Sequence, residues 1–146
     1  MTNAEVVERY AAASAENDLA TLTRLRHRHW IVEWPQSGER VVSSDAFASI
    51  VEAYPGGRPH VRVARVVGSE DRWVVTPTNS VMRVAGSGDY WWSEWVMTYP
   101  DGQVYHCIDL LELREGAVYR EAVYWAPPFD APDWRAPFVQ GPGTGV

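Results

Sequence analysis

The chain has 146 residues, a formal net charge of −6 and 13 basic side chains, all of them Arg. This length predicts one domain with room for a core and a ligand cavity. The acidic balance and the lack of a basic cluster argue against nucleic acid as a partner, and no apolar run approaches the length of a membrane span. A single cysteine rules out an internal disulfide and, with an N-terminus that lacks an apolar signal core, predicts a cytoplasmic protein.

Aromatic residues are unusually frequent, with eight Trp and seven Tyr. Such side chains line small-molecule pockets and interfaces, so the excess favours a ligand cavity or a dimer, beside the plain alternative of a bulky core. No spacing of His, Asp and Glu predicts a metal site, and no Gly-rich loop precedes a helix to bind a nucleotide phosphate. We therefore expect a small-molecule ligand and no cofactor or metal.

The N-terminal segment has the pattern of a capped helix. Thr2 and Glu5 have the spacing of a capping box, and an apolar stripe at helical intervals continues to about Ala15. The stripe consists of Val6, Tyr10 and Ala13. Tyr10 is therefore expected to point into the core.

A second helix is expected after Asp18, which has the character of an N-cap. Its apolar face would be Leu19, Leu22 and Leu25. The basic run at 24–29 is expected near the C-terminal end of this helix, where positive charge suits the helix dipole. His27 and His29 in that run are expected on the solvated surface, although a His-x-His pair can also hold a metal.

Strand patterns dominate from there on. Ser43 or Ser44 is expected to cap a third helix, which ends at residues 55–57 (Pro-Gly-Gly). The expected strands are 30–34 before this helix and, after it, 61–67, one long or two short strands within 72–84 interrupted near Pro77, and 90–99. The glycines at 86–88 predict a hairpin turn.

Residues 103–127 contain two strand-like runs joined by Arg-Glu-Gly at 114–116, which predicts an antiparallel hairpin. Both faces of the first run are largely apolar, so we expect this strand inside a sheet that is covered on both sides. Asp109 lies among Ile, Leu and Cys neighbours. A buried ionised carboxylate is costly unless it is paired, and otherwise its pKa rises and it keeps its proton. Asp109 is thus the strongest single indication of chemistry.

The segment after the hairpin is too rich in proline for regular structure, yet it carries Phe129, Trp134 and Phe138. We expect it to pack across the body of the protein and to close a pocket. Residues 140–146 are expected to be disordered, so the domain would span residues 1–139.

Three helices followed by antiparallel strands predict an α+β fold in which a strongly curved sheet encloses a cavity. The order of elements also resembles the NTF2-like superfamily of cone-shaped α+β barrels, which includes ketosteroid isomerases, SnoaL-type polyketide cyclases and limonene-epoxide hydrolases. The strings that carry the resemblance are VVERYAAASAENDLATL, IVEWPQSGE, YPDGQ and CIDLLELREGAVYREAVYW, within about 4–136.

The resemblance to ketosteroid isomerases implies that Tyr10 and Asp109 donate hydrogen bonds to a developing oxyanion. That family's proton-shuttling base is an Asp at the position of Trp34, and an indole cannot accept a proton. Glu33 cannot replace it, because neighbouring strand residues face opposite ways. Isomerisation by that route is therefore not expected. An epoxide hydrolase would need an Asp-Arg-Asp set that we do not find at the corresponding positions.

The last strand supplies another carboxylate. If the family pattern holds, Glu121 faces the cavity beside Asp109, so that one carboxyl group would act as acid and the other as base. The resemblance to SnoaL-type cyclases implies a similar chemistry, in which one acidic residue abstracts and returns a proton while the pocket folds the substrate. A register shift of one residue would place Glu121 on the outer face instead. The expected pocket wall is Trp34, Trp95, Cys107, Val123 and Trp125.

The sequence thus favours an enzyme that isomerises or cyclises a hydrophobic, carbonyl-bearing molecule, with Tyr10, Asp109 and Glu121 as catalytic candidates. The alternative is a non-catalytic ligand-binding or dimerisation module, which the indole at Trp34 favours. A homodimer through the outer sheet face is expected, because His106, Ile108 and neighbouring side chains leave that face too apolar for solvent.

Overall fold

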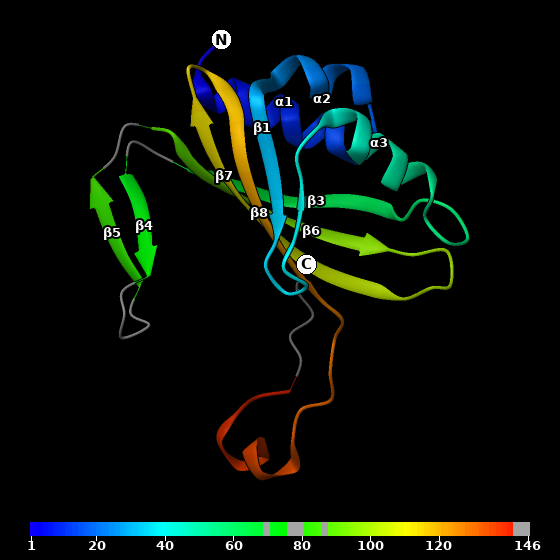
Figure 1. Cartoon of the computed structure of the whole chain (residues 1–146). Helices are drawn as coiled ribbons and strands as arrows, with labels where there is room; N and C mark the ends of the chain where they lie inside the picture. Colours follow the sequence, from blue (N-terminus) through cyan, green and yellow to red (C-terminus); the bar gives the residue numbers. More distant parts are fainter. Residues whose placement is uncertain (69–70, 76–80, 86–87, 142–146) are drawn as a thin grey trace.

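The structure is a computed structural model that describes residues 1–68, 71–75, 81–85 and 88–141, with side chains described for 1–63 and 88–141. In this part of the chain, helices come first and most of the strands follow (Figure 1). The elements are α1 (Asn3–Glu16), α2 (Leu19–Leu25), β1 (Arg26–Trp34), β2 (Glu39–Val41), α3 (Ser44–Glu52), β3 (His60–Gly68), β4 (Asp71–Val75), β5 (Val81–Ala85), β6 (Tyr90–Thr98), β7 (Val104–Arg114), β8 (Ala117–Ala126) and the short 3-10 helix η1 (Asp133–Phe138). No helix among these residues is long and apolar enough to cross a membrane.

The ends of the helices follow from side-chain capping. The Thr2 hydroxyl accepts a hydrogen bond from the Glu5 backbone N–H, and the Glu5 carboxylate accepts one from the Thr2 N–H, so the expected capping box is confirmed. Asn17 caps the C-terminal end of α1, and its φ of 56° is left-handed. Asp18 caps α2 and Ser43 caps α3, also as expected.

The basic run begins in the last turn of the second helix at Arg24, as expected, but the first strand begins earlier than predicted, at Arg26 and not at Trp30. α2 ends at Leu25, and the residues from Arg26 onward belong to β1. The reason is pairing across the sheet, since β1 runs parallel to β8 from the partners Arg26 and Val118 onward. Those distant hydrogen bonds outweigh the helix propensity of Arg-rich sequence.

Six strands form one curved sheet in the order β2-β1-β8-β7-β6-β3. All neighbours are antiparallel except β1 and β8, which are parallel. Figure 1 shows the three helices gathered over one face of this sheet. The core lies between the two layers, and its largest cluster includes Val6, Val7, Leu22, Trp30, Leu111, Leu113 and Val118. The expected α+β architecture is confirmed.

The β7–β8 hairpin is confirmed, and among the described residues of the single chain its sheet is covered on one face. Cys107, Asp109 and Leu111 are buried against the helices. On the opposite face Ile108 and Leu110 are 44% and 45% exposed. No element of the described part of the chain covers that outer face, because all three helices lie on the other side.

The region 72–84 contains two short strands, one of the two forms expected for it. β4 and β5 pair with each other as a separate two-stranded sheet, with Asp71 opposite Ala85. Pro77 and Gly86 lie outside the described residues, whereas Gly88 has a φ of +79°, which suits glycine in a turn.

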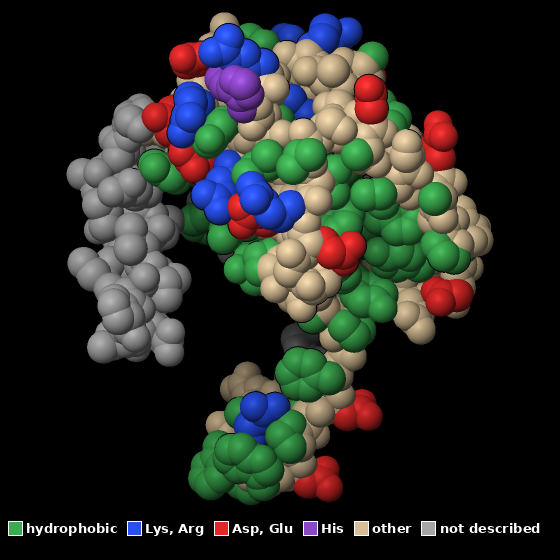
Figure 2. Space-filling view, in the orientation of Figure 1, with side chains coloured by type: hydrophobic (Ala, Val, Ile, Leu, Met, Phe, Trp, Pro, Cys, Tyr) green, Lys and Arg blue, Asp and Glu red, His purple; other side chains and the backbone are tan. Residues whose placement is uncertain are grey.

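The proline-rich tail does not pack across the body, contrary to expectation. Phe129, Trp134 and Phe138 are 82%, 70% and 81% exposed. The tail leaves the end of β8 and extends away from the sheet (Figure 2). Consecutive prolines at 127–128 fix φ and stiffen the chain at its exit, which explains why it does not fold back. Most of the segment expected to be disordered, 142–146, lies outside the described residues.

Candidate functional site

A cavity of about 740 Å³ lies between the helices and the inner face of the sheet. All eight side chains that the sequence placed in the site line it: Tyr10, Trp34, Trp95, Cys107, Asp109, Glu121, Val123 and Trp125. Arg26 lines it as well, together with aromatic side chains of α3 and the loops, so the cavity combines apolar walls with a small ionisable floor.

Glu121 is the centre of a buried network at this floor. It is 5% exposed, and one of its oxygens, Oε2, accepts two hydrogen bonds. The Tyr10 hydroxyl donates one over 2.7 Å, and the Trp30 indole N–H donates the other over 2.6 Å. These two donors hold Oε2 of Glu121 at a fixed place in the floor of the cavity. The inward direction expected for Glu121 is observed, since its neighbour Arg120 is exposed.

Arg26 completes the network from the first strand. Its Nε donates to the Tyr10 hydroxyl over 2.8 Å, and one terminal nitrogen donates to the Ser44 hydroxyl over 3.0 Å. The guanidinium lies 3.7 Å from the centre of the Trp30 ring and 4.8 Å from that of Phe47. Because Arg26 donates to the Tyr10 oxygen, the hydroxyl proton is directed at Glu121. Arg26 thus helps to position Glu121, because it orients the Tyr10 hydroxyl that donates to Glu121.

Tyr10 therefore has a different bonding partner from the one the sequence suggested. The resemblance implied a hydroxyl free to bond an oxyanion, whereas the Tyr10 proton is directed at Glu121. Burial, and then the negative charge of Glu121, raise the pKa of Tyr10 well above its ordinary value. The phenol stays protonated and holds Glu121 in place.

One oxygen of the buried Asp109 carboxyl group lacks a hydrogen-bond partner. The residue is 7% exposed, and the unpartnered oxygen is Oδ1. Asp109 pairs with Val123 on β8, and Glu121 is two residues along on the same face, within diagonal reach. Burial, and then the charge of Glu121, raise the pKa of Asp109 well above its ordinary value. The protonated form of Asp109 is thus favoured at this position beside Glu121.

Aromatic rings form the walls of the cavity. Trp34 and Trp125 meet edge to face with ring centres 5.7 Å apart, and the Trp95 indole donates to the Ser93 hydroxyl over 2.6 Å. Cys107 is buried in the same wall, and burial raises the pKa of its thiol to about 11. A thiol this weakly acidic serves as wall rather than nucleophile.

Family membership follows from the comparison with known proteins. A family model described as a SnoaL-like domain matches residues 7–121. This chain belongs to the SnoaL-like domain family. No curated protein matches it.

Solved structures place this SnoaL-like chain among NTF2-like folds. An NTF-2 like protein of unknown function from Burkholderia xenovorans LB400 is 26% identical, with a TM-score of 0.67, and the match covers 97% of this chain and 95% of that one. A putative ketosteroid isomerase from Kribbella flavida DSM 17836 is 18% identical, with a TM-score of 0.73 and coverages of 97% and 90%. An LEH-like epoxide hydrolase from M. tuberculosis is 12% identical, with a TM-score of 0.55 and coverages of 84% and 80%. At these identities the second and third likenesses show the fold alone.

In this SnoaL-like chain, the residue at the position of the ketosteroid isomerase base is Trp34, which forms part of the cavity wall. The neighbouring Glu33 faces outward, where Arg120 contacts it at 2.6 Å and Arg40 at 3.9 Å. The expectation that Glu33 cannot serve as the base is consistent with this geometry.

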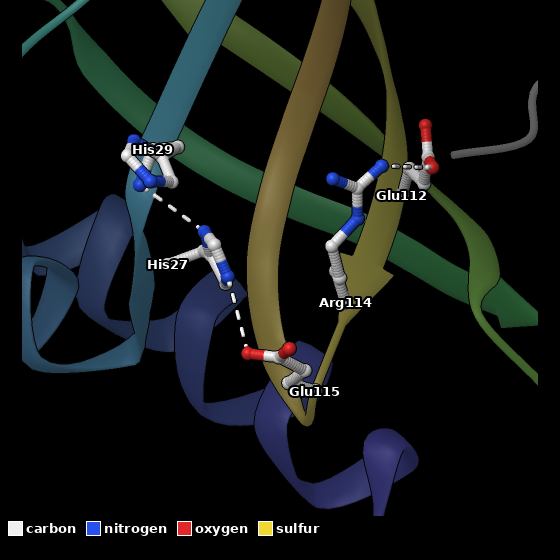
Figure 3. A network of polar contacts seen from close by, with 5 residues as sticks. All are labelled: His27, His29, Glu112, Arg114 and Glu115. Carbon is white, nitrogen blue, oxygen red and sulfur yellow. Dashed lines mark hydrogen bonds and ion pairs between the residues drawn. The ribbon is translucent and has the colours of Figure 1, made fainter.

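Of the four histidines, His60 lines the cavity, whereas His27, His29 and His106 do not. His27 was expected on the solvated surface, but its side chain is only 9% exposed, between the Tyr119 ring and Glu115, which it contacts at 3.4 Å (Figure 3). His29 is exposed as expected, and His106 lies on the outer face. Within the part of the chain that the structure describes, no three His, Cys, Asp or Glu side chains gather as a metal site.

Sequence reasoning missed Arg26, Trp30 and Ser44. Alternate residues of a strand face the same side, so the inward-facing Val32 and Trp30 predict that other even-numbered residues of the strand also face inward. That alternation could have indicated Arg26. Arg26 was not recognised because it belongs to a basic run, and most Arg side chains in such a run are solvated. Ser44 had been considered only as a helix cap.

Proposed function

We propose that this SnoaL-like chain is a cofactor-independent enzyme that isomerises or cyclises a hydrophobic, carbonyl-bearing small molecule by acid and base catalysis. The observation that carries the proposal is the unpartnered Oδ1 of Asp109, a buried oxygen in a cavity wall next to the fixed carboxylate of Glu121. A buried polar atom without a partner needs an explanation, and a ligand that completes its bonds supplies one.

The two carboxyl groups have different roles in this proposal. The neutral carboxyl of Asp109 donates a hydrogen bond to the substrate carbonyl oxygen, where negative charge develops. Glu121 takes a proton from the carbon next to that carbonyl and gives it back at another carbon in an isomerisation. In a cyclisation, the activated carbon attacks an electrophilic carbonyl of the same molecule, and the proton returns to the new alkoxide. Each sequence conserves atoms and needs no cofactor.

The remaining residues position the base and shape the pocket. Tyr10 and Trp30 hold Oε2 of Glu121, and Arg26 fixes the direction of the Tyr10 hydroxyl. The Trp34 and Trp125 rings offer flat apolar surfaces to a ring-shaped substrate. A hydrophobic ligand with one polar atom near Asp109 would match this distribution.

Proton exchange on a model ketone tests the chemistry without the natural substrate. 2-Tetralone in D₂O should lose its α-protons to solvent faster with wild type than without protein, as followed by NMR. Replacing Asp109 by Ala should slow the exchange by about 10²–10³-fold, the usual cost of an oxyanion donor. Glu121→Gln, which removes the base, should abolish the protein-dependent exchange. Glu33→Gln is the matched control, because that carboxylate lies on the outer face. Equal exchange in wild type and Asp109→Ala would contradict the proposal.

A second candidate function is binding without turnover, and Trp34 favours it because an indole stands where ketosteroid isomerases keep their base. Titration with 2-naphthol, followed by its fluorescence, separates the two. Binding that depends on Asp109 but is accompanied by no exchange of 2-tetralone protons would support a ligand-binding module. Binding together with exchange would support the enzyme.

A further inference from the structure

Two tryptophan rings meet at a right angle in the wall of the cavity. Trp34 of β1 and Trp125 of β8 both line it, with their planes at 89° and their ring centres 5.7 Å apart. The face of an aromatic ring carries the negative part of its quadrupole. Two perpendicular indoles therefore form a corner in which two electron-rich faces are turned toward the same ligand group.

Elsewhere in the protein, aromatic faces of this kind are covered by arginine. The Arg26 guanidinium lies 3.7 Å from the centre of the Trp30 ring, and that of Arg114 lies 3.6 Å from the centre of the Tyr119 ring. Among the residues whose side chains the structure describes, no arginine lies over the two rings of the corner. Their faces are thus available to a cation that comes with the ligand.

Glu39 adds a negative charge beside the corner. It pairs with Trp34 across the β1–β2 hairpin and lines the cavity as well. Side chains of directly paired residues lie on the same face of a sheet, with their Cβ atoms about 4.5–5.5 Å apart. Glu33, on the outer face, contacts Arg120 and Arg40, whereas Glu39 has no ion pair among the described side chains. The carboxylate next to the rings is therefore the one that lacks an arginine.

The turn between β1 and β2 fixes the backbone of both tryptophans. The Gly38 N–H donates to the Trp34 carbonyl over 2.9 Å. The Gln36 side-chain amide donates to the Trp125 carbonyl over 2.7 Å and accepts from the Trp125 N–H over 2.8 Å. Gln36 thus takes the place of a neighbouring strand beyond the last β1–β8 pair. A corner positioned in this way loses little freedom when a ligand binds.

We propose that the corner formed by Trp34, Trp125 and Glu39 binds an organic cation, and that the ligand of this cavity carries a methylated ammonium group. Aromatic faces attract such a group, more strongly where water is excluded, and a carboxylate adds Coulomb attraction. The other charged side chains of the cavity agree in sign. Apart from Asp109 and His60, its acidic and basic lining residues are three glutamates and two arginines, namely Glu16, Glu39, Glu121, Arg26 and Arg58.

The position of the corner relative to Asp109 sets the length of the ligand. Trp125 pairs with Cys107 on β7, and Asp109 lies two residues further along that strand, a rise of about 7 Å. This step rests on the proposed function, in which Asp109 binds the substrate carbonyl. The substrate would then carry its ammonium group about 7 Å from the carbonyl oxygen.

Choline and its uncharged isostere 3,3-dimethylbutan-1-ol test the corner by proton NMR titration of the full chain. The N-methyl signal of choline should move upfield as protein is added, because protons held over an indole face are shielded. Choline should bind about 10-fold more tightly than the alcohol, because only choline carries the charge.

Variants assign this binding to the corner. Trp34→Leu and Glu39→Gln should each weaken choline binding by about 5- to 10-fold, and Glu39→Gln should leave the alcohol unaffected. Trp134→Leu and Glu33→Gln are the matched controls, since both residues lie outside the cavity. Thermal unfolding checks that each variant is folded, and Glu39 is exposed, so its replacement should not disturb the core. Equal affinities for choline and the alcohol would overturn the proposal. So would choline binding that folded Glu39→Gln and Trp34→Leu leave unchanged.

A pair of ketones separates this proposal from the proposed function. In 6-(trimethylammonio)hexan-2-one the carbonyl oxygen and the ammonium nitrogen can lie about 7 Å apart, and 7,7-dimethyloctan-2-one is its uncharged isostere. Exchange of α-protons in D₂O should have an about 10-fold higher kcat/KM for the ammonium ketone. Equal values, with exchange that still depends on Asp109, would overturn the ammonium assignment alone. Choline binding that requires Trp34 and Glu39, without exchange of either ketone, would support the corner and contradict the proposed function.

Discussion

Tyr10 in the first helix and Glu121 in the last strand, 111 residues apart, are joined by a buried hydrogen bond of 2.7 Å between the phenol hydroxyl and Oε2. The same hydroxyl accepts from Arg26, so Tyr10 connects a buried cation to a buried carboxylate that do not touch. This arrangement keeps both charges hydrogen-bonded at the floor of the cavity.

Removal of the Tyr10 hydroxyl should therefore destabilise the fold as well as the site. Tyr10→Phe leaves Arg26 without one acceptor and Glu121 without one donor, and each unfilled buried bond costs about 1–3 kcal/mol. We expect the free energy of unfolding in urea to fall by about 3 kcal/mol. Tyr105→Phe is a suitable control, since that hydroxyl bonds only to the exposed side chain of Gln103 in the recorded contacts. A fall of less than about 0.5 kcal/mol would contradict the network.

The coupling between Arg26 and Glu121 can be measured by a double-mutant cycle. Arg26→Met alone leaves a buried carboxylate without its nearby cation, which costs about 3–5 kcal/mol. In the double variant with Glu121→Gln, neither charge remains. The double variant should therefore lose less stability than the sum of the single ones, by about 1–3 kcal/mol in urea unfolding. Additive losses would show that Tyr10 does not connect the two residues.

The raised pKa of Asp109 predicts how the stability of the fold depends on pH. Its pKa is raised in the folded chain, by burial first and by Glu121 second, so its contribution is fully present below the unfolded pKa of about 4 and is lost as pH rises through the folded value. Asp109→Asn cannot ionise. The variant should gain in stability relative to wild type from about pH 4 upward, in urea unfolding at a series of pH values. Parallel curves for the two proteins would contradict a buried neutral acid.

Cys107 should react slowly with alkylating reagents. Since burial raises the pKa of its thiol to about 11, the thiolate is scarce at pH 8, and labelling by iodoacetamide should be about 100-fold slower than for an unperturbed thiol. Mass spectrometry over time measures the rate, with glutathione in the same tube as the reference. The rate should rise in urea as the chain unfolds. Labelling of the native chain as fast as that of glutathione would contradict the buried position.

The elements that could be predicted from sequence are those set by local rules. The capping box at Thr2 and Glu5, the turn at 114–116 and the alternation that turns Glu121 inward depend on residues close in sequence. The start of β1 could not be found in this way, because its first residue pairs with Val118. Arg26 was missed for the same reason, since its burial depends on Tyr10 and Ser44 from two other elements.

The outer sheet face shows a second limit of sequence reasoning. Period-two patterns showed that both faces of β7 are apolar, but not whether a helix of the same chain covers the second face. That depends on the side to which the helices pack. The direction of the Tyr10 hydroxyl was likewise set by a donor, Arg26, that lies 16 residues away on another element. Residue types thus indicated a cavity with carboxyl groups, and the partners of each group came only from the fold.

The parallel pairing of β1 with β8 has a consequence for folding. The strand at 26–34 has a neighbour along both edges only when the strand at 117–126 has joined it. Contacts of such sequence separation make folding slow, because a long loop must close before they form. During synthesis, the Tyr10 hydroxyl and the Trp30 indole N–H therefore lack their Glu121 acceptor, and β1 exposes one edge, until β8 has been made.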